Sequence, residues 1–249
     1  MNGLRITKDN MSHPSINGEN RNYEIDVLRG LAIVLMVIFH FSYDLTVFGW
    51  ADFSTAKDIE WRIFRTFIVS SFLLAVGMSS YLAYHKYLNK KKLIKTIGKL
   101  FSVSLFISIG SLFMHPSTWV YFGIIHFITL ALPISVLFVR APYIALVIGS
   151  GCIVGYWMGI LNLYPIWEWG VLHLGIPTQT VDLVSFFPWI GVVLIGIFVM
   201  YKELFNINIK SSAFSNTLAF LGQHSLIIYL VHQPILYGLF GLVDIVLLR

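Results

Sequence analysis

The sequence has little charge. Only 12% of its 249 residues are Asp, Glu, Lys or Arg, while 57% are hydrophobic and the mean hydropathy is +0.78. An average soluble domain carries about 25% charged residues. So few polar groups cannot cover a water-soluble globule, which excludes ordinary cytosolic, disordered and fibrous proteins. The composition predicts an integral membrane protein.

The sequence also lacks the common signals of soluble enzymes. Its single cysteine, Cys152, excludes an intramolecular disulfide and a Cys-rich zinc site. It contains no phosphate-binding P-loop, no dinucleotide-binding glycine pattern, no HExxH and no GxSxG. We therefore expect no metal or haem, and no nucleic-acid partner despite a pI near 9.3. Any chemistry must come from His, Asp, Arg and Gln within the membrane.

What is present is a series of long apolar runs. Residues 1–22 are polar and are expected to form a mobile cytoplasmic tail, and residues 23–249 a single transmembrane domain. Spanning helices need about 20 apolar residues each, and a barrel would instead need alternating segments of about 10 residues. The sequence predicts an all-α polytopic helix bundle with seven spans. They are 27–48, 63–84, 97–114, 120–138, 143–161, 185–201 and 224–247.

Basic residues predict the orientation of this bundle. Of the 17 Lys and Arg residues, only Lys57, Arg62, Arg65 and Arg249 fall on the side opposite the N-terminus. The connection after the second span alone is rich in lysine, from Lys86 to Lys99. Because cytoplasmic loops carry the excess of Lys and Arg, the N-terminus is predicted to be cytoplasmic and the C-terminus outside. The expected location is a prokaryotic plasma membrane.

The first span carries polar residues that hydrocarbon should not contain. Arg29 and His40 lie about three turns, or roughly 16 Å, apart on one helix face, and Asp44 follows His40 at i, i+4. A charge at mid-membrane costs at least about 2.5–3.5 kcal/mol, so such residues are functional candidates. Arg29 could instead anchor the helix at the interface, and His40 with Asp44 could be a structural pair. An imidazole–carboxylate pair is also how a general base is oriented.

Two further spans add polar residues. The last contains His224, His232, Gln233 and the helix-bending Pro234, and the fourth contains His126. A kink with ordinary interhelical hydrogen bonds would explain the last span without catalysis. His126, taken singly, is more typical of a structural residue.

Four sequence blocks, in order, resemble a known family. They are YEIDVLRGLAIVLMVIFH (23–40), FGIIH (122–126), D-x5-PWIGVVLIG (182–196) and LGQHSLIIYLVHQP (221–234). Together they are similar to the heparan-alpha-glucosaminide N-acetyltransferase catalytic-domain family in its short prokaryotic form. Arg29 and His40 match the R-x10-H signature of related transmembrane acyltransferases. The resemblance covers nearly the whole chain, without the extra luminal domain of the animal enzyme, so the acceptor need not be heparan.

The resemblance implies transfer of an acetyl group from cytoplasmic acetyl-CoA to an amino or hydroxyl group of a glycan-like acceptor outside. Arg29, His224 and Gln233 are the expected donor-binding residues, and Arg29 with the Lys-rich loop suits CoA phosphates. His40 with Asp44 would deprotonate the acceptor. His126, His232 or Gln233 would donate a hydrogen bond to the oxyanion. His40 carrying the acetyl group covalently is the alternative.

Two other functions fit some of the residues. A redox protein could hold haem b between two of His40, His126 and His232. A proton-coupled transporter or a flippase could use the same His and Asp residues as a relay, without CoA chemistry. The expected partners are otherwise the acyl-CoA, the acceptor and the bilayer, with a homodimer as a possible assembly.

Overall fold

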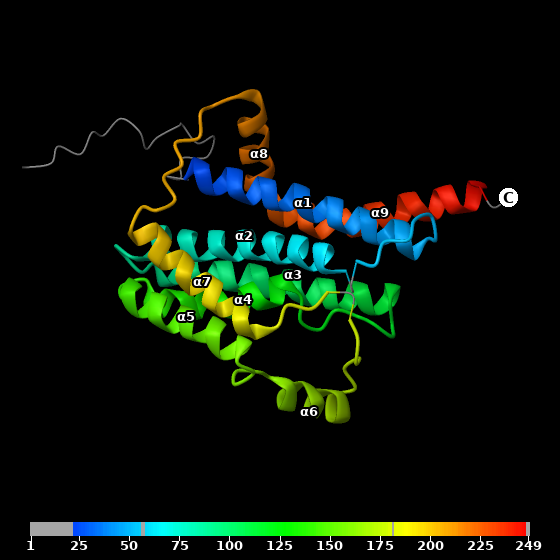
Figure 1. The fold of residues 1–249 in the computed structure, drawn as a ribbon, viewed down its shortest axis with the longest axis horizontal. Coiled ribbons are helices and arrows are strands. Elements are labelled where there is room, and N and C mark those ends of the chain that lie inside the picture. Colours follow the sequence, from blue (N-terminus) through cyan, green and yellow to red (C-terminus); the bar gives the residue numbers. More distant parts are fainter. Residues whose placement is uncertain (1–21, 56–57, 181, 248–249) are drawn as a thin grey trace, which may run out of the picture.

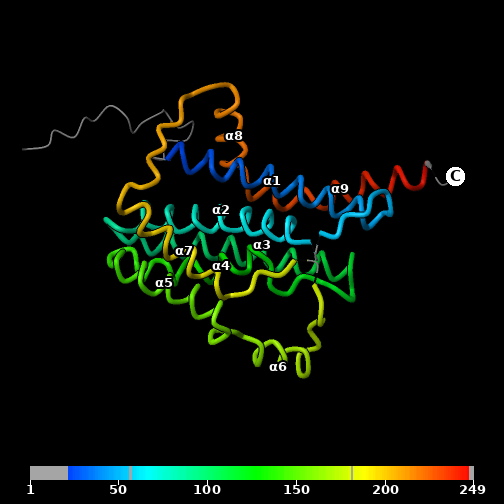
Figure 2. The backbone as a smooth tube through the Cα atoms, viewed as in Figure 1, coloured from blue at the N-terminus to red at the C-terminus, as the bar shows by residue number. Residues whose placement is uncertain are grey.

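The computed structural model describes residues 22–55, 58–180 and 182–247. Within these ranges the chain forms helices, with one isolated bridge between Phe122 and Leu183, which confirms the all-α class. Figure 1 labels the helices and Figure 2 traces the backbone through them. They are α1 (Tyr23–Val47), α2 (Ile59–Tyr84), α3 (Lys90–Met114), α4 (Ile124–Phe138), α5 (Pro142–Trp157), α6 (Tyr164–Leu174), α7 (Phe186–Tyr201), α8 (Ala213–Gln223) and α9 (Ser225–Leu247).

Each of the seven predicted apolar stretches contains one helix. Four of them, α1, α2, α3 and α9, are long and apolar enough to cross a membrane, whereas α4, α5 and α7 are shorter apolar helices. The largest boundary difference is at α3, which begins at Lys90 rather than 97 because lysine is a good helix former and Asn89 caps the end, accepting a bond from the Lys92 N–H at 2.9 Å. The predicted tail, residues 1–22, lies outside the described residues except for Asn22, which caps α1.

Two short helices lie between the predicted spans. Helix α6 occupies the aromatic-rich connection 162–184, with Pro165 in its first turn and Gly175 in the left-handed conformation at its end. It stands apart from the other helices in Figure 1. Helix α8 crosses the beginning of α1, where the Tyr23 hydroxyl donates to Ser215 at 2.9 Å.

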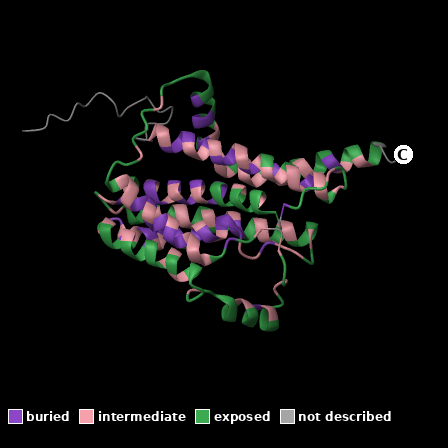
Figure 3. Cartoon of the chain, in the orientation of Figure 1, coloured by how far each residue is buried: buried purple, intermediate pink, exposed green. Residues whose placement is uncertain are grey.

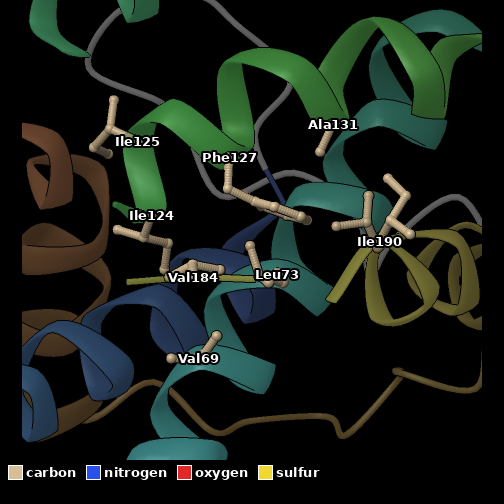
Figure 4. Close-up of a cluster of buried hydrophobic side chains, with 9 residues drawn as sticks. Val69, Leu73, Ile124, Ile125, Phe127, Ala131, Val184 and Ile190 are labelled. Carbon is tan, nitrogen blue, oxygen red and sulfur yellow. The ribbon is translucent and has the colours of Figure 1, made fainter. Parts of the chain in front are cut away.

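The main apolar core lies where α2, α4 and the beginning of α7 meet (Figure 4). Its central side chains, Leu73, Phe127 and Val193, are fully buried. Figure 3 shows that the outward faces of the helices are exposed, and many of these exposed side chains are large and apolar, such as Phe101, Phe106 and Phe113 of α3. An apolar exterior of this kind belongs in lipid, so the chain is an integral membrane protein.

Glycines let two pairs of helices approach closely. A Cβ atom at Gly77 of α2 would overlap the Val193 carbonyl of α7, and a Cβ at Gly30 of α1 would overlap the Leu218 carbonyl of α8. Small residues allow such backbone contact between membrane helices. These crossings hold α2 against α7 and α1 against α8.

Candidate active site

A cavity of about 820 Å³ runs lengthwise between α1, α2, α4, α9 and the segment before α7. Arg29 lines one end, and its guanidinium donates to the Ser79 hydroxyl of α2 at 2.6 Å. Arg62 and Arg65, near the start of α2, line the other end. Arg65 and Ser79 are separated by roughly 21 Å of helix at about 1.5 Å per residue. The cavity thus extends over most of the ~30 Å hydrocarbon thickness.

Two histidines from different helices meet beside this cavity. The rings of His40 on α1 and His232 on α9 lie with their centroids 4.9 Å apart. His40 lines the large cavity and also a second cavity of about 150 Å³, whereas His232 lines only the second. His40 has no hydrogen bond with any described residue. Among the candidate histidines His40, His126, His224 and His232, only the rings of His40 and His232 contact each other within the described residues.

His232 is held in one tautomer. Its Nδ1 lies 2.6 Å from the Tyr229 carbonyl oxygen, which can only accept, so Nδ1 carries the proton of the neutral ring. Its Nε2 is buried and has no partner among the described residues. The Nε2 lone pair is therefore available to accept a proton.

The sequence analysis paired Asp44 with His40, but in the structure Asp44 is hydrogen-bonded to Gln233. The Gln233 amide Nε2 donates to Asp44 Oδ1 at 2.9 Å, and the Asp44 side chain is fully buried. The i, i+4 spacing places Asp44 and His40 on one face of α1, but α9 packs against that face and supplies a closer donor. Asp44 Oδ2 and Gln233 Oε1 are buried without partners among the described residues.

Asp182, Tyr229 and Arg65 are cavity residues that the sequence analysis did not assign to the site. The Tyr229 hydroxyl donates to Asp182 Oδ2 at 2.9 Å, and Arg65 donates to the Leu183 carbonyl at 2.6 Å. These contacts join α9 and α2 to the segment before α7. The position of Asp182 directly before a long apolar run was the available signal, but its partners are distant in sequence.

His126 and His224, both predicted site residues, line neither cavity. His126 Nδ1 accepts from the Gly123 N–H at 3.2 Å, so the proton is on Nε2, 2.9 Å from the Ser108 hydroxyl. Both of its nitrogens thus hold the start of α4. His224 is exposed, and its Nδ1 donates to the Phe220 carbonyl at 2.8 Å at the end of α8. The structure brings together His40, Asp44, His232 and Gln233. Of these only His40 lines the large cavity, and Arg29 lies at the far end of that cavity.

The geometry suits removal of a proton from a substrate in the large cavity. His40 and His232 are in direct ring contact, which leaves no space for a haem plane between them. Within the described residues, no group of three or more His, Cys, Asp or Glu side chains could hold a metal ion. An imidazole with free nitrogens, next to a second imidazole of fixed tautomer, can take a proton from a hydroxyl or amine and pass it on.

Comparison with known proteins gives one match. The family model described as heparan-alpha-glucosaminide N-acetyltransferase, catalytic, matches residues 21–234. In the same comparisons no curated protein and no solved structure matches the chain.

Proposed function

Because the chain belongs to the heparan-alpha-glucosaminide N-acetyltransferase catalytic family, we propose that it transfers an acetyl group from acetyl-CoA to an amino or hydroxyl group of a glycan-like acceptor on the other side of a prokaryotic plasma membrane. One observation carries the proposal. A single cavity reaches from Arg29 to Arg65 and passes His40 on the way. A donor and an acceptor entering from opposite ends would meet at that histidine.

The donor is assigned to the Arg29 end. The described Lys and Arg residues gather at this end, apart from Arg62 and Arg65, and the lysines of Lys90–Lys92 begin α3 there. An excess of basic residues is typical of the cytoplasmic side, where acetyl-CoA is found. Guanidinium and ammonium groups pair well with phosphate. The pantetheine arm would extend from Arg29 along the roughly 16 Å of α1 that leads to His40.

The reaction proposed at His40 is a direct acyl transfer. The acceptor nitrogen or oxygen attacks the thioester carbonyl while His40 takes its proton. The new C–N or C–O bond forms, the C–S bond breaks, and the proton passes to the CoA sulfur. His232 packs against His40 and keeps its ring in place. The second N–H of the Gln233 amide is free to donate to the developing oxyanion, and one well-aimed donor of this kind contributes about 3–4 kcal/mol.

The acceptor is assigned to the opposite end. Thr180, Gln179 and Arg62 line the cavity there and offer hydroxyl, amide and guanidinium groups. Such groups hydrogen-bond the hydroxyls of a sugar. We assign His126 a structural role at α4, and His224 no role in the cavity.

A cavity that extends between both ends also favours a transporter, and donor binding separates the two functions. We expect acetyl-CoA to raise the thermal unfolding temperature of detergent-purified protein saturably, because a ligand that binds the native state stabilises it. Dephospho-CoA and buffer are the controls.

A matched pair of variants locates the donor. Arg29→Gln should reduce the acetyl-CoA-dependent shift, whereas Arg140→Gln, which removes an exposed arginine at the same end that lines no cavity, should leave it unchanged. No shift in the wild-type protein at millimolar acetyl-CoA would make the transporter the better function.

A further inference from the structure

A second, smaller cavity adjoins the site at His40. It has a volume of about 150 Å³ and lies between the outer halves of α1, α3 and α9, and its lining includes the exposed side chains of Phe106 and Met114. His40, Tyr43, Asp182 and Tyr229 line both this cavity and the large one. A group bound at His40 can therefore extend into either space.

The lining of the small cavity is mainly apolar. Phe106, Ile107 and Met114 of α3 line it together with Leu230 and Pro234 of α9, and the polar residues Ser111, Gln233 and Tyr237 contribute a smaller part of the surface. His232, whose Nε2 has no partner among the described residues, lines it beside His40. A sugar placed here would leave most of its hydroxyls without hydrogen-bond partners, which costs free energy. A short hydrocarbon chain would not.

We propose that this cavity receives the tail of an acyl group longer than acetyl, so that the enzyme binds short-chain acyl-CoA donors of up to about six carbons. The inference rests on the proposed function. An apolar cavity of about 150 Å³ is known to hold a molecule the size of benzene. With the thioester carbonyl beside His40 and His232, the tail of a butyryl or hexanoyl group continues into the small cavity.

One glycine makes the inference testable. Gly110 of α3 lines the small cavity, and a Cβ atom built there meets nothing within 4 Å. A leucine at this position would therefore add a bulky side chain at the cavity lining without a clash at its Cβ. Gly98, on the same helix, also has open space at its Cβ but lines neither cavity. Gly98→Leu is thus a matched control for Gly110→Leu.

The experiment compares dissociation constants of acetyl-, butyryl- and hexanoyl-CoA for the purified protein, measured by calorimetry in one detergent. In the wild-type protein we expect hexanoyl-CoA to bind about tenfold more tightly than acetyl-CoA, because each buried methylene favours binding. Gly110→Leu should abolish that preference and keep the acetyl-CoA affinity. Gly98→Leu should retain it. Met114→Trp, which narrows the same cavity from a half-exposed position, should act as Gly110→Leu does.

Three results would overturn the inference. The first is that acetyl-CoA binds but hexanoyl-CoA binds no more tightly, and the second is that the preference for hexanoyl-CoA survives in both Gly110→Leu and Met114→Trp. In either case the cavity does not hold the acyl tail, and the acetyltransferase function stands. If no acyl-CoA binds, the proposed function fails together with the inference.

Discussion

The two site histidines differ in what their ring nitrogens are bound to. His232 donates its Nδ1 proton to the Tyr229 carbonyl and is fixed, whereas His40 has no hydrogen bond with a described residue and borders both cavities. A residue that is tied to the backbone on one side serves best to hold a neighbour in position. A residue with both nitrogens free can contact the substrate. This difference is why we propose His40, rather than His232, as the residue that takes the proton of the acceptor.

Replacing His40 by Ala should lower turnover at least about 100-fold, since a positioned acid–base group contributes 10²- to 10⁴-fold. The acetyl-CoA-dependent thermal shift and the unfolding temperature should change little, because no hydrogen bond is lost. Turnover would be followed as CoA thiol released in the presence of a glycan acceptor. His173→Ala, in α6 and remote from both cavities, serves as the control. Loss of folding in His40→Ala would assign His40 to the structure instead.

Sequence reasoning predicted which polar residues share a helix face, but it did not predict their hydrogen-bond partners on other helices. Arg29 and His40 could be placed on one face because both lie on α1, where the helical period alone fixes their relation. The partner of Asp44 could not be found this way, since Gln233 comes from α9 and only the packing of two helices brings them together. The same holds for Asp182 and Tyr229. His126 was a candidate because it is a histidine within an apolar span, but both of its ring nitrogens are hydrogen-bonded, to Ser108 and Gly123.

At the scale of the helices, apolar runs predicted where the apolar helices lie but not how they pack, and four of these helices are long enough to cross a membrane. All seven stretches became helices because hydrocarbon requires internally satisfied backbone groups. The short helices α6 and α8 were missed because neither has an apolar run of spanning length. Glycines mark where helices pack closely: Gly77 and Gly196 face each other at the crossing of α2 and α7.

This crossing gives a prediction about stability. Gly77→Ala should destabilise the protein by about 1–3 kcal/mol or more, because its Cβ would force the backbones of α2 and α7 apart. Gly98→Ala should be neutral or slightly stabilising, since alanine favours a helix by up to about 1 kcal/mol and nothing lies near its Cβ. Thermal unfolding in one detergent compares the two variants. Equal unfolding temperatures would show that the two helices can separate without cost.

At the scale of the whole molecule, the basic residues are distributed unequally between the two ends of the large cavity. The lysines of α3 begin at the end that carries Arg29, while Arg62 and Arg65 stand at the opposite end of the same cavity. The sequence alone predicted which loops share a side, because basic residues favour the cytoplasm. It could not predict the cavity, whose walls come mainly from α1, α2, α4, α9 and the segment before α7. Together they assign one end to the donor and the other to the acceptor.

This assignment predicts sidedness. Radiolabelled acetyl-CoA, which is too highly charged to cross a bilayer, should bind saturably to inverted membrane vesicles, which expose the Arg29 end, and not to right-side-out vesicles. Replacing Lys90, Lys91 and Lys92 by Gln should weaken this binding at low ionic strength, and the difference should disappear at high salt, because exposed charges are screened. Arg29→Gln should weaken binding at both salt concentrations, since that side chain lines the cavity itself. Equal binding to the two kinds of vesicle would contradict this sidedness, and binding to right-side-out vesicles alone would place the donor at the Arg65 end.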